Sequence, residues 1–169
     1  MLRRLALLLP LLLVAGCDSN GGNAQLVFED EALLSPIQGF TQVSATGTVG
    51  ARDASDWRIG PAYVGIVSVL ALPTPNPVPR TGSVALAFNV VGGVPGGLDV
   101  VVLQEDSLTG EITFRDLVDG QCRQATASTF CTFDLSARQI DYRNTGGLYR
   151  LVVLDGRGIA SYGDVRVDL

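Results

Sequence analysis

The residues of this sequence with the clearest chemical potential are three cysteines and 17 Asp and Glu residues. The chain contains no histidine, the most common acid–base residue of enzymes. A serine or cysteine nucleophile normally needs a histidine base, so the composition argues against a catalytic triad. Two thiolates without histidine do not complete a tetrahedral zinc site, and no metal or cofactor is predicted. Carboxylate chemistry, disulfide formation and thiol acylation remain.

Paired carboxylates can cleave glycosidic bonds as acid and base or nucleophile. Glu105-Asp106 and the pair Asp116 and Asp119 are the candidates for such a site. Acidic residues in loops are more often solvated surface groups, and that interpretation is favoured here. We therefore predict no catalytic residue and keep a carboxylate-based envelope hydrolase as the alternative.

Two acidic clusters and one aromatic residue have possible binding roles. Glu29-Asp30-Glu31 and the pair Asp53 and Asp56 could supply oxygen ligands to calcium, but neither spacing matches a known calcium loop. Trp57, the single tryptophan, lies between Asp56 and Arg58 and could contact a sugar or a partner. A buried position is favoured for Trp57, because lone tryptophans are mostly buried.

The first 16 residues are expected to be a signal peptide. Arg3 and Arg4 precede an apolar run of about ten residues, which is the layout of a secretory signal. A membrane-spanning helix needs about 20 apolar residues, so this run is too short to be one.

The sequence Val14-Ala15-Gly16-Cys17 resembles the lipobox of bacterial lipoproteins. The resemblance implies cleavage before Cys17 and a thioether-linked diacylglyceryl group on its sulfur, with a further acyl chain on its amino group. Two or more acyl chains anchor a protein stably to a membrane. The predicted location is the exported side of a bacterial envelope membrane, and the choice between inner and outer membrane stays open. The alternative is an ordinary signal peptide with a chance cysteine.

Cys122 and Cys131 remain as an even pair in an oxidising compartment. Eight residues lie between them, including the turn-prone stretch 126–129. We predict a disulfide that staples a hairpin, with two free thiols as the alternative.

The charge balance argues against a nucleic-acid partner. The mature chain would have 10 Arg (12 − 2) against 17 acidic residues, a formal charge of −7, with no Lys. An acidic chain without a basic cluster is a poor ligand for polyanions. The glycine-rich stretch 92–97 is followed by neither a helix nor a Lys, so a loop is favoured over a phosphate site.

The organisation predicted from the pattern is a flexible lipidated tether over residues 17–23 and one all-β domain over residues 24–169. A helical turn is expected within Leu135–Tyr142, where Ser136 and Gln139 have capping-box spacing. The expected strands are rich in β-branched residues and separated by Gly and Pro: 25–29, 40–49 (a strand or hairpin), 63–72, 83–91, 98–104, 111–115, 147–154 and 159–169.

The last two expected strands flank Asp155-Gly-Arg-Gly158, a strong hairpin signal. Strand 147–154 is apolar on both faces, which predicts an interior position. In the final strand, Val165, Val167 and Leu169 are expected to face the core, and the intervening Asp164, Arg166 and Asp168 are expected to face water. Many short strands at this spacing predict a β-sandwich.

From Pro75 to Leu169, the chain resembles the immunoglobulin-like sandwiches that serve as sorting domains of the type IX secretion system, and the related modules of flagellar hook-capping proteins. The shared features are Pro75-Asn76-Pro77 before a strand, Gly147-Leu-Tyr149 and the turn at 154–158. Val78 replaces the usual Phe after the first motif. The resemblance implies a small immunoglobulin-like β-sandwich.

Together, these features predict a lipid-anchored envelope protein. Its sandwich would be a non-enzymatic module that has a structural role or binds a protein or glycan.

Overall fold

The computed structural model describes residues 20–92, 94, 96–105, 112–122 and 128–169. The expected signal peptide and Cys17 lie outside the described residues.

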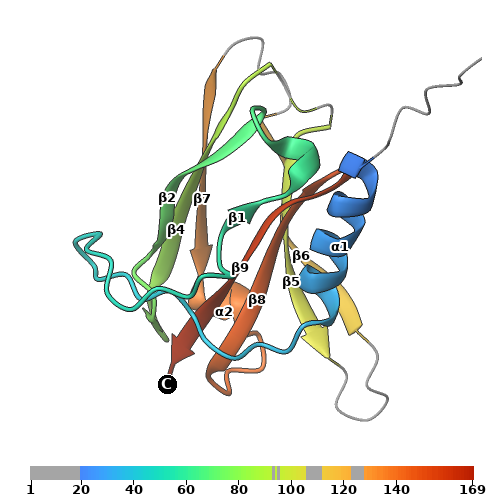
Figure 1. Cartoon of the computed structure of the whole chain (residues 1–169). Helices are drawn as coiled ribbons and strands as arrows, with labels where there is room; N and C mark the ends of the chain where they lie inside the picture. The colour runs from blue at the N-terminus through green and yellow to red at the C-terminus, as the bar shows by residue number, and fades with distance from the viewer. Residues whose placement is uncertain (1–19, 93, 95, 106–111, 123–127) are drawn as a thin grey trace, which may run out of the picture.

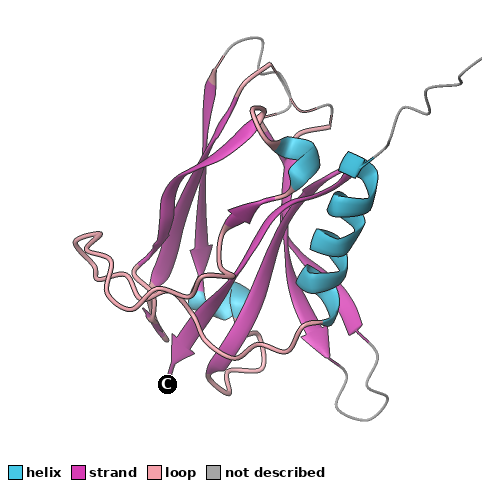
Figure 2. Ribbon diagram, in the orientation of Figure 1, coloured by secondary structure: helices cyan, strands magenta, loops and turns pink. Residues whose placement is uncertain are grey.

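Two layers of strands form the body of the molecule, and all the described strand pairs are antiparallel except β3 with β9, which is parallel (Figure 1). One sheet has the order β2-β4-β7, and the other has the order β1-β9-β8-β5-β6, with β3 also paired to β9. Strands dominate the residues that the structure describes, and helices are few among them (Figure 2). The elements are α1 (Asn20–Leu34), β1 (Arg58–Ile59), η1 (Pro61–Tyr63), β2 (Val67–Thr74), β3 (Val78–Pro79), β4 (Ser83–Val90), β5 (Leu98–Glu105), β6 (Ile112–Gln121), β7 (Thr129–Ser136), α2 (Ala137–Ile140), β8 (Gly147–Asp155) and β9 (Gly158–Asp168).

The strand order is that of an immunoglobulin-like sandwich, so the predicted fold class is confirmed. Of the seven long strands, the first, second and fifth form one sheet, and the seventh, sixth, third and fourth form the other. Tyr149, near the start of β8, occupies the position of a tyrosine corner: its hydroxyl donates to the Gly146 carbonyl at 3.4 Å.

The principal core lies between the sheets. The largest buried side chains from the three-stranded sheet include Phe88 and Phe133, whose ring centroids are 6.1 Å apart in an edge-to-face arrangement. The other sheet contributes Leu98, Leu151 and Val165 to the same cluster.

Strand β8 is an interior strand, as predicted, because it pairs with β5 on one side and β9 on the other. Its outer face is covered by α1, and Val152 packs there with Phe28 and Ala32. This second, smaller core explains why β8 is apolar on both faces.

Helix α1 corrects two predictions. Residues 25–29 are helical and do not form a strand, and Asn20–Asn23, assigned to a tether, form the first turn of α1. Ala, Gln, Leu and Glu are good helix formers, and the positions facing the sheet follow helical spacing. Gln25 also donates to Glu29 at 2.7 Å, an i,i+4 pair.

Other boundaries differ from the prediction. The stretch 40–49, predicted as a strand or hairpin, forms a short hairpin: a tight turn at 44–48 joins Val43 and Val49, which are paired by an antiparallel bridge, and Val43 also bridges to Asn76. The expected strand 63–72 begins only at Val67, after η1. Strand β7 was not predicted, although Cys131, Phe133 and Leu135 alternate with exposed residues. The remaining strands and the capping box of Ser136 and Gln139 are confirmed.

The Pro75-Asn76-Pro77 motif has a structural role. Asn76 is fully buried, and its amide nitrogen donates to the carbonyls of Thr41 at 2.9 Å and Asp164 at 3.0 Å. Its side-chain oxygen accepts from the Arg166 backbone at 3.0 Å. Asn76 therefore joins the loop around Thr41 to the edge of β9.

Trp57 is buried in the principal core, so the interpretation favoured from the sequence is confirmed. Its ring lies against Gly163 of β9, where a Cβ atom would approach the indole within 2.3 Å. We expect Gly163→Ala to destabilise the fold by about 1–3 kcal/mol, the usual effect of overpacking a core.

Chemical denaturation followed by the fluorescence of Trp57 measures this effect. Gly156→Ala is the matched control, because a Cβ atom there meets nothing within 4 Å. Equal stability of the two variants would show that the contact with Trp57 is not tight.

Candidate functional site

A groove of about 500 Å³ opens at the end of the sandwich where α1 ends. Four segments that are distant in the sequence meet there: the end of α1 with the residues that follow it, the end of β5, the start of β6, and the connection from α2 into β8 (Figure 1). The described lining residues are Leu33, Leu34, Ser35, Pro36, Ile37, Leu103, Gln104, Ile112, Asp141, Tyr142, Arg143, Thr145, Leu148 and Tyr149.

Nine of the 14 described lining residues are apolar or aromatic, and several of these side chains are exposed. Leu34 is 69% exposed and Tyr142 is 52% exposed, and a little over a third of the Ile112 and Leu148 side chains is accessible. Exposed apolar side chains gathered in one concave site mark a binding surface more often than single scattered ones do.

Two arginines lie close to the ring of Tyr142, which lines the groove. The guanidinium carbon of Arg115 lies 5.0 Å from the ring centroid and that of Arg143 lies 5.4 Å from it, within cation–π range. Arg143 also donates to the Tyr142 hydroxyl at 2.8 Å, and Arg115 donates to the Ile140 carbonyl at 2.9 Å. Two guanidinium groups thus lie beside a ring that lines the groove, although the chain as a whole is acidic.

Asp141 is the only carboxylate among the described lining residues, and it is buried. Burial alone would raise the pKa of Asp141, but hydrogen bonds, including one from the Gly146 amide at 2.7 Å, outweigh it and lower the pKa. A glycosidase acid needs a raised pKa and a second carboxylate. The described part of the groove has neither.

The groove wall formed by α1 is held by a buried ion pair. Arg150 of β8 and Asp164 of β9 are directly opposite each other and form two hydrogen bonds, of 2.8 and 3.0 Å. The remaining guanidinium nitrogen of Arg150 donates to the carbonyls of Ser35 at 2.7 Å and Ala32 at 3.2 Å. Arg150 thus caps the C-terminal end of α1 and fixes it to the sheet.

This ion pair also corrects the prediction for the last strand. Asp164 was expected to face water, but it is buried because α1 covers this face and Arg150 compensates its charge. Leu169, expected to face the core, is 77% exposed.

Asp56, a candidate calcium ligand, belongs to the same network. Its carboxylate accepts hydrogen bonds from the Thr41 amide at 2.6 Å and the Asp164 amide at 2.9 Å. Burial nevertheless raises the pKa of Asp56 from 3.8 to about 6. Burial also raises the pKa of Asp164, against the opposing effect of Arg150.

A pH dependence of stability follows. Between pH 4 and 6, the folded state holds a proton on Asp56 that the unfolded state lacks, so the free energy of unfolding falls as pH rises through this range and levels off above it. We expect a decrease of about 2 kcal/mol from this residue. Denaturant titrations at each pH should show this slope for the native chain and a shallower one for Asp56→Asn.

Asp53→Asn is a control, because the contribution of Asp53 to stability changes with pH in the opposite direction to that of Asp56. Hydrogen bonds from Ser55 lower the pKa of Asp53, so its contribution is present above the usual pKa and is lost as pH falls. If the free energy of unfolding changed equally with pH in the native chain and in Asp56→Asn, the pH dependence could not be assigned to Asp56.

The other candidate residues do not form a site in the described chain. Glu29 and Glu31 bond to different partners, the Ile159 amide and Arg58. Asp116 and Asp119 are exposed on β6, while the side chain of Glu105 and the whole of Asp106 lie outside the described residues. The described residues contain no group of three or more Cys, Asp and Glu that could hold a metal ion.

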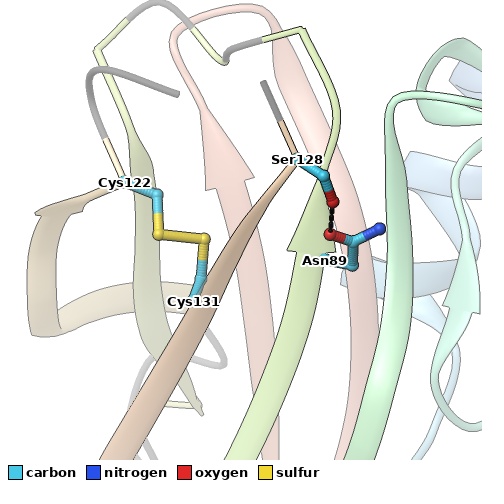
Figure 3. Close-up of a disulfide and its surroundings, with 4 residues drawn as sticks. All are labelled: Asn89, Cys122, Ser128 and Cys131. Atoms are coloured by element: carbon cyan, nitrogen blue, oxygen red, sulfur yellow. Dashed lines mark hydrogen bonds between the residues drawn. A yellow bond between two sulfur atoms is a disulfide. The ribbon is translucent and has the colours of Figure 1, made fainter. Parts of the chain in front are cut away.

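The predicted disulfide between Cys122 and Cys131 is present, with Cα atoms 6.0 Å apart (Figure 3). It does not staple a paired hairpin, because β6 pairs with β5 whereas β7 pairs with β4. The bridge instead joins the two sheets at the end opposite the groove. Near it, Ser128 donates to Asn89 at 2.5 Å.

No family model and no curated protein matches the sequence. Among solved structures, an immunoglobulin-like protein from Pseudomonas aeruginosa is 12% identical, with 69% of this chain and 100% of that chain covered and a TM-score of 0.35. A beta-glucosidase from Listeria innocua (13% identical, TM-score 0.44) matches over 70% of this chain and 17% of its own length.

The alkylpurine DNA glycosylase of Pseudomonas fluorescens is 15% identical, with a TM-score of 0.43. It matches over 61% of this chain and 30% of its own length. The chain thus spans less than a third of the two enzymes, and the immunoglobulin-like assignment rests on the strand order described above.

Proposed function

We propose that this chain is an acylated protein of the bacterial cell envelope whose β-sandwich is a non-enzymatic binding module. The observation that carries the binding role is the groove at the end of α1, with its exposed apolar side chains and the two arginines beside Tyr142. The resemblance of Pro75–Leu169 to sorting and hook-capping modules supports the fold, and no sorting role is proposed.

The anchor in this proposal is the acylated Cys17. The apolar run that ends in Val14-Ala15-Gly16-Cys17 supports it. In the described part of the chain, no helix has the length and apolar character needed to cross a bilayer. Cys17→Ser should abolish incorporation of labelled palmitate and release the protein from the membrane fraction, and undiminished labelling would refute acylation at Cys17.

The ligand proposed for the groove is a segment of a protein with apolar side chains next to a carboxylate. Aliphatic walls formed by residues such as Leu34, Ile112 and Leu148 favour apolar side chains over a hydroxyl-covered sugar. The guanidinium groups of Arg115 and Arg143 lie beside the Tyr142 ring, and a carboxylate on the ligand would complement their charge.

A random peptide library on phage, selected on the mature chain carrying Cys17→Ser, tests this ligand class. The selected peptides should combine aliphatic residues with Asp or Glu, and Leu34→Asp should abolish their binding. Leu26→Asp is the matched control on the same helix, since Leu26 is 60% exposed and lies outside the groove lining. Selection of no such peptides, or equal loss of binding in both variants, would contradict the proposal.

A further inference from the structure

We infer that the end of the sandwich opposite the groove rests in the interface of the membrane that holds the anchor. The contact surface, called here the anchor-side tip, consists of Pro61, Ala62, Val64 and Val91. This inference rests on the proposed acylation of Cys17 and adds a lipid surface as a second partner of the domain.

Hydrogen bonds place the anchor-side tip beside the N-terminal half of α1. The Ala62 amide donates to the Gln25 side chain at 3.0 Å, and Gln25 donates to the Ile159 carbonyl at 2.9 Å. The Val91 amide donates to the Ile66 carbonyl at 2.8 Å, which joins the second loop to the first. Figure 1 shows the start of α1, η1 and the end of β4 at one end of the molecule, with the end of α1 at the other.

The four residues of the tip are apolar and uncharged. Val64 is 71% exposed and Val91 is 47% exposed, and Pro61 and Ala62 are also exposed. Between Arg58 and Asp99, the sequence has a single charged residue, Arg80, which follows β3. The half-exposed side chain of Arg157 borders this surface, because its guanidinium lies 5.4 Å from the ring centroid of Tyr63. At a bilayer interface this cation would stay among the anionic headgroups while the apolar area of the tip leaves water.

The position of the proposed anchor brings this end to the membrane. Only two residues separate Cys17 from Asn20, the first residue of α1, so the anchor lies within about 10 Å of the helix start even if the chain is fully extended. With 15 residues, α1 is about 22 Å long, and its far end carries the groove. The groove would thus face away from the membrane, where it is accessible to a protein partner.

The outer side of α1 is the other apolar surface near the anchor. It carries the exposed Leu26 and Val27, but Asp30 is exposed one turn later on the same side. Laying this side on a bilayer would cost the desolvation of a carboxylate. We therefore assign the lipid contact to the tip.

Fluorescence quenching in vesicles tests the inference. With the Cys17 sulfur acylated and Cys122 bonded to Cys131, a cysteine introduced by Val64→Cys is the single free thiol for an environment-sensitive dye. The acylated protein is reconstituted into vesicles of phosphatidylethanolamine and phosphatidylglycerol that contain nitroxide-labelled lipid. The dye at position 64 should lose most of its fluorescence, whereas dyes placed by Leu26→Cys and Leu148→Cys should lose little.

The outcomes separate this inference from the proposed anchoring. Protein that floats with the vesicles but shows no quenching at position 64, or stronger quenching at position 26, would overturn the tip contact and leave the anchor standing. Acylation-competent protein that fails to float with the vesicles would overturn the anchor and the tip contact with it.

Discussion

Arg150→Met should cost the domain about 3–5 kcal/mol, the usual effect of removing one partner of a buried ion pair. Asp164 would be left buried without its counter-charge, and the carbonyls of Ala32 and Ser35 would lose their donor. Such a loss is a large part of the total stability of a domain, about 5–15 kcal/mol. Denaturant unfolding followed by circular dichroism measures the effect.

Arg166→Met is the matched control, because Arg166 also pairs with an aspartate, Asp168, but both side chains are exposed. We expect a change below about 1 kcal/mol there. The double variant Arg150→Met, Asp164→Leu should recover part of the loss, since an apolar pair can replace a buried ion pair. Similar stability losses in the two Arg variants would refute the importance of the buried pair.

A chain that ends at Gly163 should not fold. This chain lacks Val165 and Val167, which are buried in the principal core. It also lacks Asp164, so Arg150 loses its ion-pair partner. The two valines account for about 3–6 kcal/mol and the unpaired Arg150 for about 3–5 kcal/mol, which together match the stability of a typical domain. Circular dichroism should show no cooperative thermal transition.

Removal of Leu169 alone is the control for this truncation. Because that side chain is 77% exposed, the shortened chain should melt close to the native chain. A cooperative β-rich transition in the chain ending at Gly163 would mean that the second half of β9 contributes little to the fold.

The sequence predicted the elements whose signals are local. The hairpin of β8 and β9 follows from alternating apolar residues around an Asp-Gly turn, and the capping box at Ser136 follows from spacing alone. Helix α1 was missed because the short window 25–29 contains Leu, Val and Phe, which fit a strand as well as a helix.

Burial that depends on distant partners could not be predicted in the same way. Asp164 occupies an outward position of its strand, and only the docking of α1 and the presence of Arg150 make that position buried. An arginine within an otherwise apolar strand was the available signal, because such a residue needs an acidic partner.

The groove was not predicted, because its walls come from four separate parts of the chain. The local signal was Tyr142-Arg143 in a loop, an aromatic side chain next to a cation. Glu105-Asp106 and Asp116 with Asp119 are candidates by residue type alone, and residue type does not indicate which side chains share a cleft.

Cross-linking in intact envelopes tests the binding role of the groove most directly. A photoreactive benzoylphenylalanine replaces Tyr142 in the groove or, as a control, Phe130, an exposed aromatic residue on β7 outside it. We expect a discrete cross-linked protein from position 142 and not from position 130, lost with Leu34→Asp and kept with Leu26→Asp. The same products from both positions, or a product at position 142 that persists with Leu34→Asp, would contradict the proposal that the groove binds a protein partner.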